Sequence, residues 1–129
     1  MGKGVSLEVD HDQAPQTAVV QQQVDARQVG GVEVLALCDV DSEHLSQSAD
    51  KVEKLQGKRP QTFKLFEDLL KLGGLDTVII ATPPHWHGLM AVAAAEAGKD
   101  IWCEKPMTRT IGEGIKVVEA VNRLTTGFV

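Results

Sequence analysis

The sequence predicts a doubly wound α/β domain built on a parallel sheet, and two observations lead to that prediction. Three apolar runs rich in branched side chains lie at residues 32–40, 75–84 and 100–106. The first two have too many consecutive apolar positions for a strand that faces solvent on one side, so helices should cover both faces of the sheet. Segments with helical spacing separate the runs, and this alternation is typical of right-handed βαβ units.

The helices are predicted from their spacing and their end signals. Asp41 or Ser42 can cap a helix that Gly57 ends. An alanine-rich helix within 87–100 should stop at Gly98, and the segment 61–74 is expected to be a short edge strand followed by a short helix. The apolar positions of the first of these helices are spaced three or four apart, at Leu45, Ala49, Val52 and Leu55.

A capping box predicts where the last helix begins. Thr110 is followed three residues later by Glu113, a spacing that lets each side chain accept a hydrogen bond from the backbone of the other residue. The apolar face of this helix is expected to consist of Ile111, Ile115, Val118, Val121 and Leu124.

The N-terminal third is predicted by weaker patterns. Alternating apolar residues in 4–9 predict a first strand, and 16–28 predicts the helix after it. The loop 10–15 would then occupy the position where such folds bind phosphate. Asp10 and Asp12 in this loop would repel an anion. With the other elements, this gives an expected strand order of 3-2-1-4-5.

Length and composition limit the function classes. The 129 residues fit one domain over 1–129, with 1–30 atypical. A formal net charge of −5 and the lack of a Lys/Arg cluster argue against nucleic-acid binding. No apolar run approaches the roughly 20 residues that span a bilayer, and the first residues lack a secretory h-region, so a cytoplasmic location is expected. Cys38 and Cys103 should lie three strand positions apart in this sheet, so no disulfide is expected between them.

Asp39 ends the 32–40 run. In dinucleotide-binding folds an acid at that place accepts hydrogen bonds from the adenosine ribose, and its charge repels the 2′-phosphate of NADP, so NAD is preferred. The alternative is that Asp39 is only a helix cap or a solvated turn acid.

The segment 81–87 follows the most apolar run. Its prolines, Pro83 and Pro84, end the strand where an α/β sheet presents its ligand crevice, and Thr82 offers a hydroxyl there. His85 and His87 offer imidazoles, although two histidines with no third cluster are thin evidence for a metal, and no metal site is predicted. The alternative is that these residues only begin the next helix.

The acid–base pair Glu104 and Lys105 ends the third run, directly before Pro106. Lys105 could bind a substrate hydroxyl or carry a proton, and Glu104 could orient it or contact a ribose. Pro106 fixes the turn and is compatible with a cis peptide bond. The alternative is a surface ion pair of little energetic value.

Taken in order, "VLALCDVD", "VIIATPPHWH" and "AAEAGKDIWCEKPMTRTIGEG" resemble the N-terminal domain of the Gfo/Idh/MocA oxidoreductases, over roughly residues 30–122. The resemblance implies a Rossmann domain that binds NAD or, less favoured, NADP. It also implies a C-terminal domain and hydride transfer to or from hydroxyls of sugars, cyclitols or related small molecules. Carried over by position, the cofactor residues would be Asp39, Thr82, Pro83, His87, Glu104 and Lys105, with Lys105 also the catalytic residue.

The sequence departs from that family in two places. The expected first strand is not followed by G-x-G-x-x-G, whose glycines let backbone amides approach a pyrophosphate. The family's C-terminal domain, which supplies oligomer contacts and a wall for the substrate, is absent from this sequence, so the chain alone is expected to be catalytically incomplete. Two hypotheses result: an NAD-dependent oxidoreductase or a piece of one, and a non-catalytic α/β module that packs against a partner.

Overall fold

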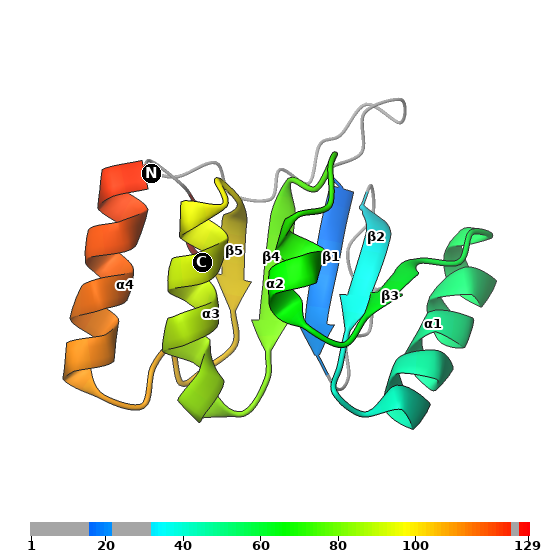
Figure 1. Cartoon of the computed structure of the whole chain (residues 1–129), viewed down its shortest axis with the longest axis horizontal. Coiled ribbons are helices and arrows are strands. Elements are labelled where there is room, and N and C mark those ends of the chain that lie inside the picture. The colour runs from blue at the N-terminus through cyan, green and yellow to red at the C-terminus, as the bar shows by residue number, and fades with distance from the viewer. Residues whose placement is uncertain (1–15, 22–31, 125–126) are drawn as a thin grey trace.

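Parallel strands form the centre of the molecule. The computed structural model describes residues 16–21, 32–124 and 127–129, and within these it contains a five-stranded sheet of order β3-β2-β1-β4-β5 (Figure 1). All neighbouring strands pair in parallel. The strands are β1 (Gln16–Gln21), β2 (Glu33–Cys38), β3 (Gln61–Phe63), β4 (Thr77–Ala81) and β5 (Asp100–Cys103). The predicted Rossmann-like α/β class and the predicted strand order are confirmed.

The central strand is not where the sequence predicted it. Residues 16–21 form β1, between β2 and β4, although this segment was expected to begin a helix. The expected strand over 4–9 and loop over 10–15 lie outside the described residues. Because Asp10 and Asp12 precede β1, they do not belong to the connection that follows it, and the expectation that they occupy a phosphate loop is wrong. The short apolar run of β1 is flanked by glutamines, and pairing on both sides overrides its weak local preference.

Apart from the helix expected over 16–28, the predicted helices are present in the described residues. They are α1 (Ser42–Gln56), α2 (Phe66–Leu70), α3 (Pro84–Glu96) and α4 (Ile111–Leu124). The carboxylate of Asp41 caps α1 by accepting from the amides of Glu43 and His44, and Gly57 ends it with a φ of 79°. At α4 the amide of Glu113 donates to the Thr110 hydroxyl at 3.2 Å, and the Thr110 amide donates to the Glu113 carboxylate at 3.3 Å, so the capping box is confirmed.

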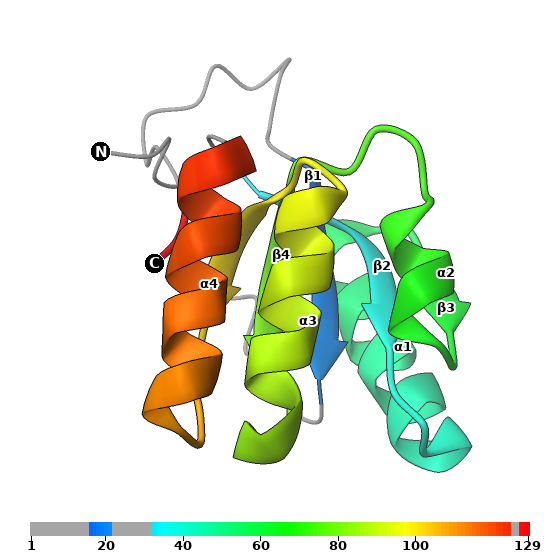
Figure 2. The ribbon, with the colours of Figure 1, turned by 60° about the vertical axis from the view of Figure 1, so that its left-hand side comes forward.

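Helices cover both faces of the sheet (Figures 1 and 2). The larger core lies under α2, α3 and α4 and includes Ile80 and Ile101, while the smaller core lies under α1. A β-bulge lets β2 contribute side chains to both cores. Thr17 and Ala18 of β1 pair with Val34 and Ala36, so Leu35 is an extra residue and the side chains after it change face. Val34 accordingly joins the smaller core and Ala36 the larger one.

The buried face of α4 differs from the prediction. Gly114, Val117 and Ala120 are the buried residues of α4, and Val117 and Ala120 share the larger core with residues of α3, whereas three residues expected on the buried face are exposed. These are Ile111, Ile115 and Val118, with exposed fractions of 85%, 54% and 52%. Small residues allow the two helices to approach closely, and this places the bulkier aliphatic side chains on the outside. On α1, Leu55 is likewise exposed, at 51%.

The last residues of the chain pair with the edge of the sheet. Phe128 forms a parallel bridge with Ile101, and the Val129 amide donates to the Ile101 carbonyl at 2.7 Å. Cys38 and Cys103 are both free thiols, as predicted, because β1 and β4 lie between their strands. No helix within the described residues is long and apolar enough to cross a membrane.

Candidate functional site

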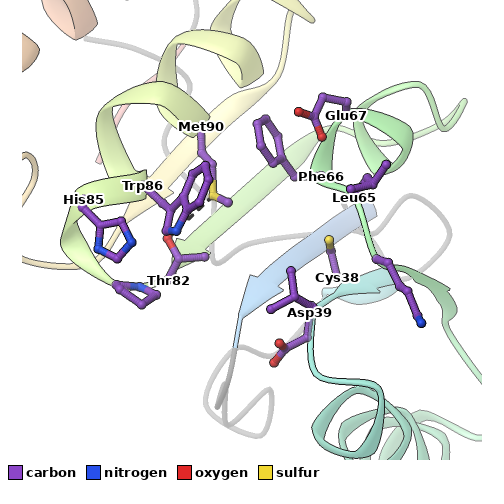
Figure 3. A pocket seen from close by; sticks show the side chains of 12 residues that line it. Cys38, Asp39, Leu65, Phe66, Glu67, Thr82, His85, Trp86 and Met90 are labelled. Atoms are coloured by element: carbon purple, nitrogen blue, oxygen red, sulfur yellow. Dashed lines mark hydrogen bonds between the residues drawn. The ribbon is translucent and has the colours of Figure 1, made fainter.

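The carboxyl ends of the parallel strands lie along one edge of the sheet, and a pocket of about 330 Å³ opens there. Its residues come from the end of β2, the connection from β3 into α2, and the end of β4 with the start of α3 (Figure 3). They are Cys38, Asp39, Val40, Lys64, Leu65, Phe66, Glu67, Thr82, Pro83, His85, Trp86 and Met90. Most of this lining is apolar, and the volume is within the range of small-molecule sites.

Asp39 is the polar anchor on one side of this pocket. It is only 8% exposed, and its main chain is held at the end of β2 by a bond from its amide to the Phe63 carbonyl. Its Oδ1 accepts from the Asp41 amide at 2.9 Å, but its buried Oδ2 has no hydrogen-bond partner among the described residues. A buried acceptor without a partner costs free energy. Asp39 is therefore prepared to accept a hydrogen bond from a ligand, and the helix-cap role belongs to Asp41.

Thr82, Trp86 and Met90 lie on the opposite side (Figure 3), and Pro83, next to Thr82 in sequence, also lines the pocket. The Thr82 hydroxyl donates to the Met90 sulfur at 3.6 Å, which holds the methionine against the pocket. Pro83 precedes the first helical residue, and Pro84 stands at the start of α3, where a missing N–H costs nothing. Two of the predicted cofactor residues thus face the same cavity as Asp39.

The apolar walls were missed by the sequence reasoning. Trp86 is 43% exposed at the pocket, and its ring stands 5.6 Å from that of His85. Phe66 and Leu65 reach the same space from the start of α2. Trp86 lies within the segment 81–87, so its place at the site could have been predicted from the sequence. Phe66 is distant from that segment in sequence, and no sequence pattern indicated that it would line the pocket.

Glu104 and Lys105 follow β5, the neighbour of β4, so they lie on the same edge of the sheet but do not line this pocket. The Glu104 amide donates to the Ile80 carbonyl at 2.9 Å, and its carboxylate accepts from the Trp102 indole at 3.4 Å. Among the described residues, no partner lies within hydrogen-bonding distance of the exposed Lys105 ammonium. The peptide bond between Lys105 and Pro106 is cis.

His87 does not face the pocket. It is 1% exposed, with one ring nitrogen 2.6 Å from the Thr82 carbonyl oxygen and the other 2.7 Å from the Pro106 carbonyl oxygen. The structure therefore brings together Asp39, Thr82 and Pro83, places Glu104 and Lys105 beside them on the same edge, and buries His87 between the two groups.

The thiols near this edge are poor nucleophiles. Burial, together with the charges of Asp39, Glu67 and Asp68, raises the pKa of Cys38 to about 12. Burial and the Glu104 charge raise the pKa of Cys103 to about 11. Both groups therefore stay protonated at neutral pH, which argues against thiolate chemistry. The described residues also contain no cluster of three or more side chains suited to a metal ion.

A parallel sheet of this order, an apolar pocket at its carboxyl edge and a buried carboxylate after the second strand define a dinucleotide-binding domain of the Rossmann type. The model of the oxidoreductase family Gfo/Idh/MocA, described as an NAD-binding Rossmann fold, matches residues 12–127. The chain belongs to this family and carries its NAD-binding domain. The resemblance in the sequence and the expected NAD cofactor are confirmed.

Known relatives are similar to parts of this domain. A glycosyl hydrolase family 109 protein of Shewanella baltica is 35% identical over 97 residues, which are 72% of this chain and 21% of the relative. An NAD-binding protein of Listeria innocua is 27% identical with a TM-score of 0.76, covering 90% of this chain and 34% of that one.

A third relative is the WlbA dehydrogenase of Bordetella pertussis, solved with NADH and UDP-GlcNAcA. It is 25% identical, with a TM-score of 0.76 over 92% of this chain and 35% of that one. The chain therefore spans about a fifth of the curated relative and about a third of these solved structures.

Proposed function

We propose that this chain is the cofactor-binding part of an NAD-dependent oxidoreductase, and that the pocket beside Asp39 holds the adenosine half of NAD. The Oδ2 of Asp39, which has no hydrogen-bond partner among the described residues, would accept from a ribose hydroxyl. Trp86 and Phe66 would enclose the adenine ring with apolar surface. The single observation that carries the proposal is this buried carboxylate oxygen at an apolar pocket, which finds no partner in the part of the chain that the structure describes. The same charge, with Glu67 nearby, disfavours the 2′-phosphate of NADP.

Lys105 and Glu104 are proposed to act at the nicotinamide end. NAD supplies the hydride acceptor when it is bound. In the reduction of a carbonyl, the carbon would gain a hydride and the oxygen would take a proton from the Lys105 ammonium to give a hydroxyl, and oxidation is the reverse of this step. The exposed ammonium of Lys105, on the edge next to β4, supports this role. Glu104 is held by Trp102 and would orient the lysine or contact a ribose.

For the complete protein, we propose a sugar or cyclitol as the substrate class. It is supported by the names of relatives: a glycosyl hydrolase of family 109, and a dehydrogenase crystallised with UDP-GlcNAcA. In such a protein, residues beyond those of this chain would supply the opposing wall of the substrate site. The residues of this chain would bind the cofactor, exclude water from it and hold the proton on Lys105.

Titration with NADH tests the cofactor site directly. Trp86 lines the pocket and Trp102 does not, so binding should quench tryptophan emission through Trp86. We expect saturable quenching in the unmodified chain and in Trp102→Phe, and a much smaller signal in Trp86→Phe. NADPH should bind more weakly than NADH. Absence of binding up to millimolar NADH by calorimetry, which does not depend on tryptophan, would overturn the proposal.

The role of Lys105 has its own test. Reduction of a small carbonyl compound by NADH should be slower in Lys105→Met than in the unmodified chain, with the NADH affinity changed less than the rate. Equal rates in the two proteins, both above the rate without protein, would show that Lys105 takes no part in proton transfer.

One observation favours the alternative of a non-catalytic packing module. The exposed stripe of α4 formed by Ile111, Ile115 and Val118 is apolar, and such stripes are typical of contact surfaces. This alternative predicts strong binding of an apolar dye, abolished in Ile115→Lys, and no binding of NADH. A chain that binds NADH and little dye would refute it.

A further inference from the structure

His87 is the most deeply buried polar side chain near the strand ends, with 1% of its surface exposed. It belongs to the first turn of α3, and both of its ring nitrogens contact main-chain carbonyl oxygens. One contact reaches Thr82, at the end of β4, over 2.6 Å, and the other reaches Pro106, after β5, over 2.7 Å. These two carbonyls are 24 positions apart in sequence. The imidazole is therefore a cross-link between two neighbouring strand ends.

The two carbonyl partners restrict which nitrogens of the His87 imidazole carry a proton. A carbonyl oxygen only accepts hydrogen bonds, so each contact needs an N–H on the imidazole. The neutral ring has one N–H and would direct a lone pair at the other oxygen. Only the imidazolium, with two N–H groups, satisfies both contacts at these distances. The start of a helix disfavours a cation, but hydrogen bonds from a charged donor are about twice as strong as neutral ones.

The surroundings do not supply a competing partner among the described residues. No hydrogen bond or ion pair joins His87 to a carboxylate. On its own helix the other ionisable groups are His85 and Glu96, and β4 carries none. The ionisable groups on the other elements next to this end of α3 are Glu67, Asp68, Cys103, Glu104, Lys105, Arg109 and Glu113. Glu113 is engaged by the capping box and by Arg109.

The two tied segments carry the residues that the proposed function uses. Thr82 lines the pocket, and Pro106 directly follows Lys105. A ring that holds both carbonyls fixes how far the lysine stands from the pocket. We propose that His87 is a positioning residue: as a doubly protonated cross-link between the ends of β4 and β5, it sets the place of Lys105 relative to the cofactor pocket. It is not itself a cofactor ligand, in contrast to the role that the sequence resemblance implied.

The effect on the cofactor rests on the proposed function, but the cross-link itself does not, so the first measurement needs no cofactor. Nitrogen-15 NMR of the histidine rings in the whole chain at neutral pH reports which nitrogens carry protons. We expect both nitrogens of His87 to be protonated and slow to exchange, with the signal assigned by its loss in His87→Gln. His44, exposed on α1, serves as the matched control in His44→Gln. A single protonated nitrogen on His87 would overturn the doubly protonated state.

The positioning role is tested by measuring the NMR signal of Lys105. Lysines are methylated with a carbon-13 label, and the Lys105 signal is identified by its loss in Lys105→Arg. We expect His87→Gln to shift or broaden that signal and His44→Gln to leave it unchanged. An unchanged Lys105 signal in a folded His87→Gln chain would overturn the positioning role.

Binding of NADH then separates the two proposals. If the chain binds NADH, His87→Gln should weaken it by about tenfold, the equivalent of one net hydrogen bond. A chain in which the lysine signal shifts but NADH does not bind would keep the cross-link and refute the proposed function. Normal NADH affinity in His87→Gln, together with an unchanged lysine signal, would refute the positioning role and keep the proposed function.

Discussion

Replacing Asp39 by asparagine should have opposite effects on cofactor binding and on the stability of the protein without cofactor. The carboxylate is 8% exposed, and its Oδ2 lacks a partner among the described residues. Asparagine keeps the oxygen that accepts from the Asp41 amide at 2.9 Å and removes the charge. Because an unsatisfied buried polar group costs about 1–3 kcal/mol, more for a charge, the free energy of unfolding without cofactor should stay equal or rise.

The cofactor should lose affinity in the same variant. A hydrogen bond from a ribose hydroxyl to a carboxylate contributes about 1.5–3 kcal/mol, so Asp39→Asn should raise the Kd for NADH roughly 10- to 150-fold. The loss should be smaller for NADPH, because the repulsion of the 2′-phosphate is relieved. Calorimetric titration and urea unfolding measure the two quantities, with the exposed Asp50→Asn on α1 as the control.

The result that would refute this reasoning is specific. A variant that binds NADH as well as the unmodified chain, yet unfolds more easily by more than about 1 kcal/mol, would show that Asp39 serves the fold. The pocket would then have to bind something that does not depend on this carboxylate.

Two further predictions concern the fold. The pKa of Cys38 is raised to about 12 and that of Cys103 to about 11, from an ordinary 9.0. The protonated thiols therefore stabilise the folded state fully below pH 9, and this contribution is lost as the pH rises through the folded-state pKa values. Urea unfolding from pH 8 to pH 11 should show this decline, and Cys38→Ala should reduce it; a decline of equal size in the variant would contradict the assignment. A Cβ at Gly88 would stand 3.3 Å from the Glu113 Cβ, so Gly88→Ala should destabilise by about 1 kcal/mol. A Cβ at Gly112 would meet nothing within 4 Å, so Gly112→Ala should stabilise the protein by roughly 0.5–1 kcal/mol. If thermal unfolding showed that both variants are stabilised, or that both are destabilised, this packing of α3 on α4 would be contradicted.

Local signals predicted most of the fold because they depend on neighbouring residues alone. The Asp41 cap, the Gly57 stop and the capping box of Thr110 and Glu113 lie where the sequence placed them. The central strand was missed since a short apolar run between glutamines is stabilised by its two partner strands. The same limit applies to α4, where Ile115 was predicted to be buried but packing against α3 buries Val117 and Ala120 instead.

The sequence by itself determined the fold class and the order of the strands, and it placed candidate groups after three of them. Since parallel strands end at one edge, Asp39, Thr82 and Lys105 had to lie on the same side of the sheet. Only the tertiary structure decided which of them share a cavity, because that depends on side chains such as Phe66 and Trp86, which arrive from different elements. It also decided that the His87 imidazole points inward to two carbonyls, a direction set by the packing of α3 and not by the order of residues.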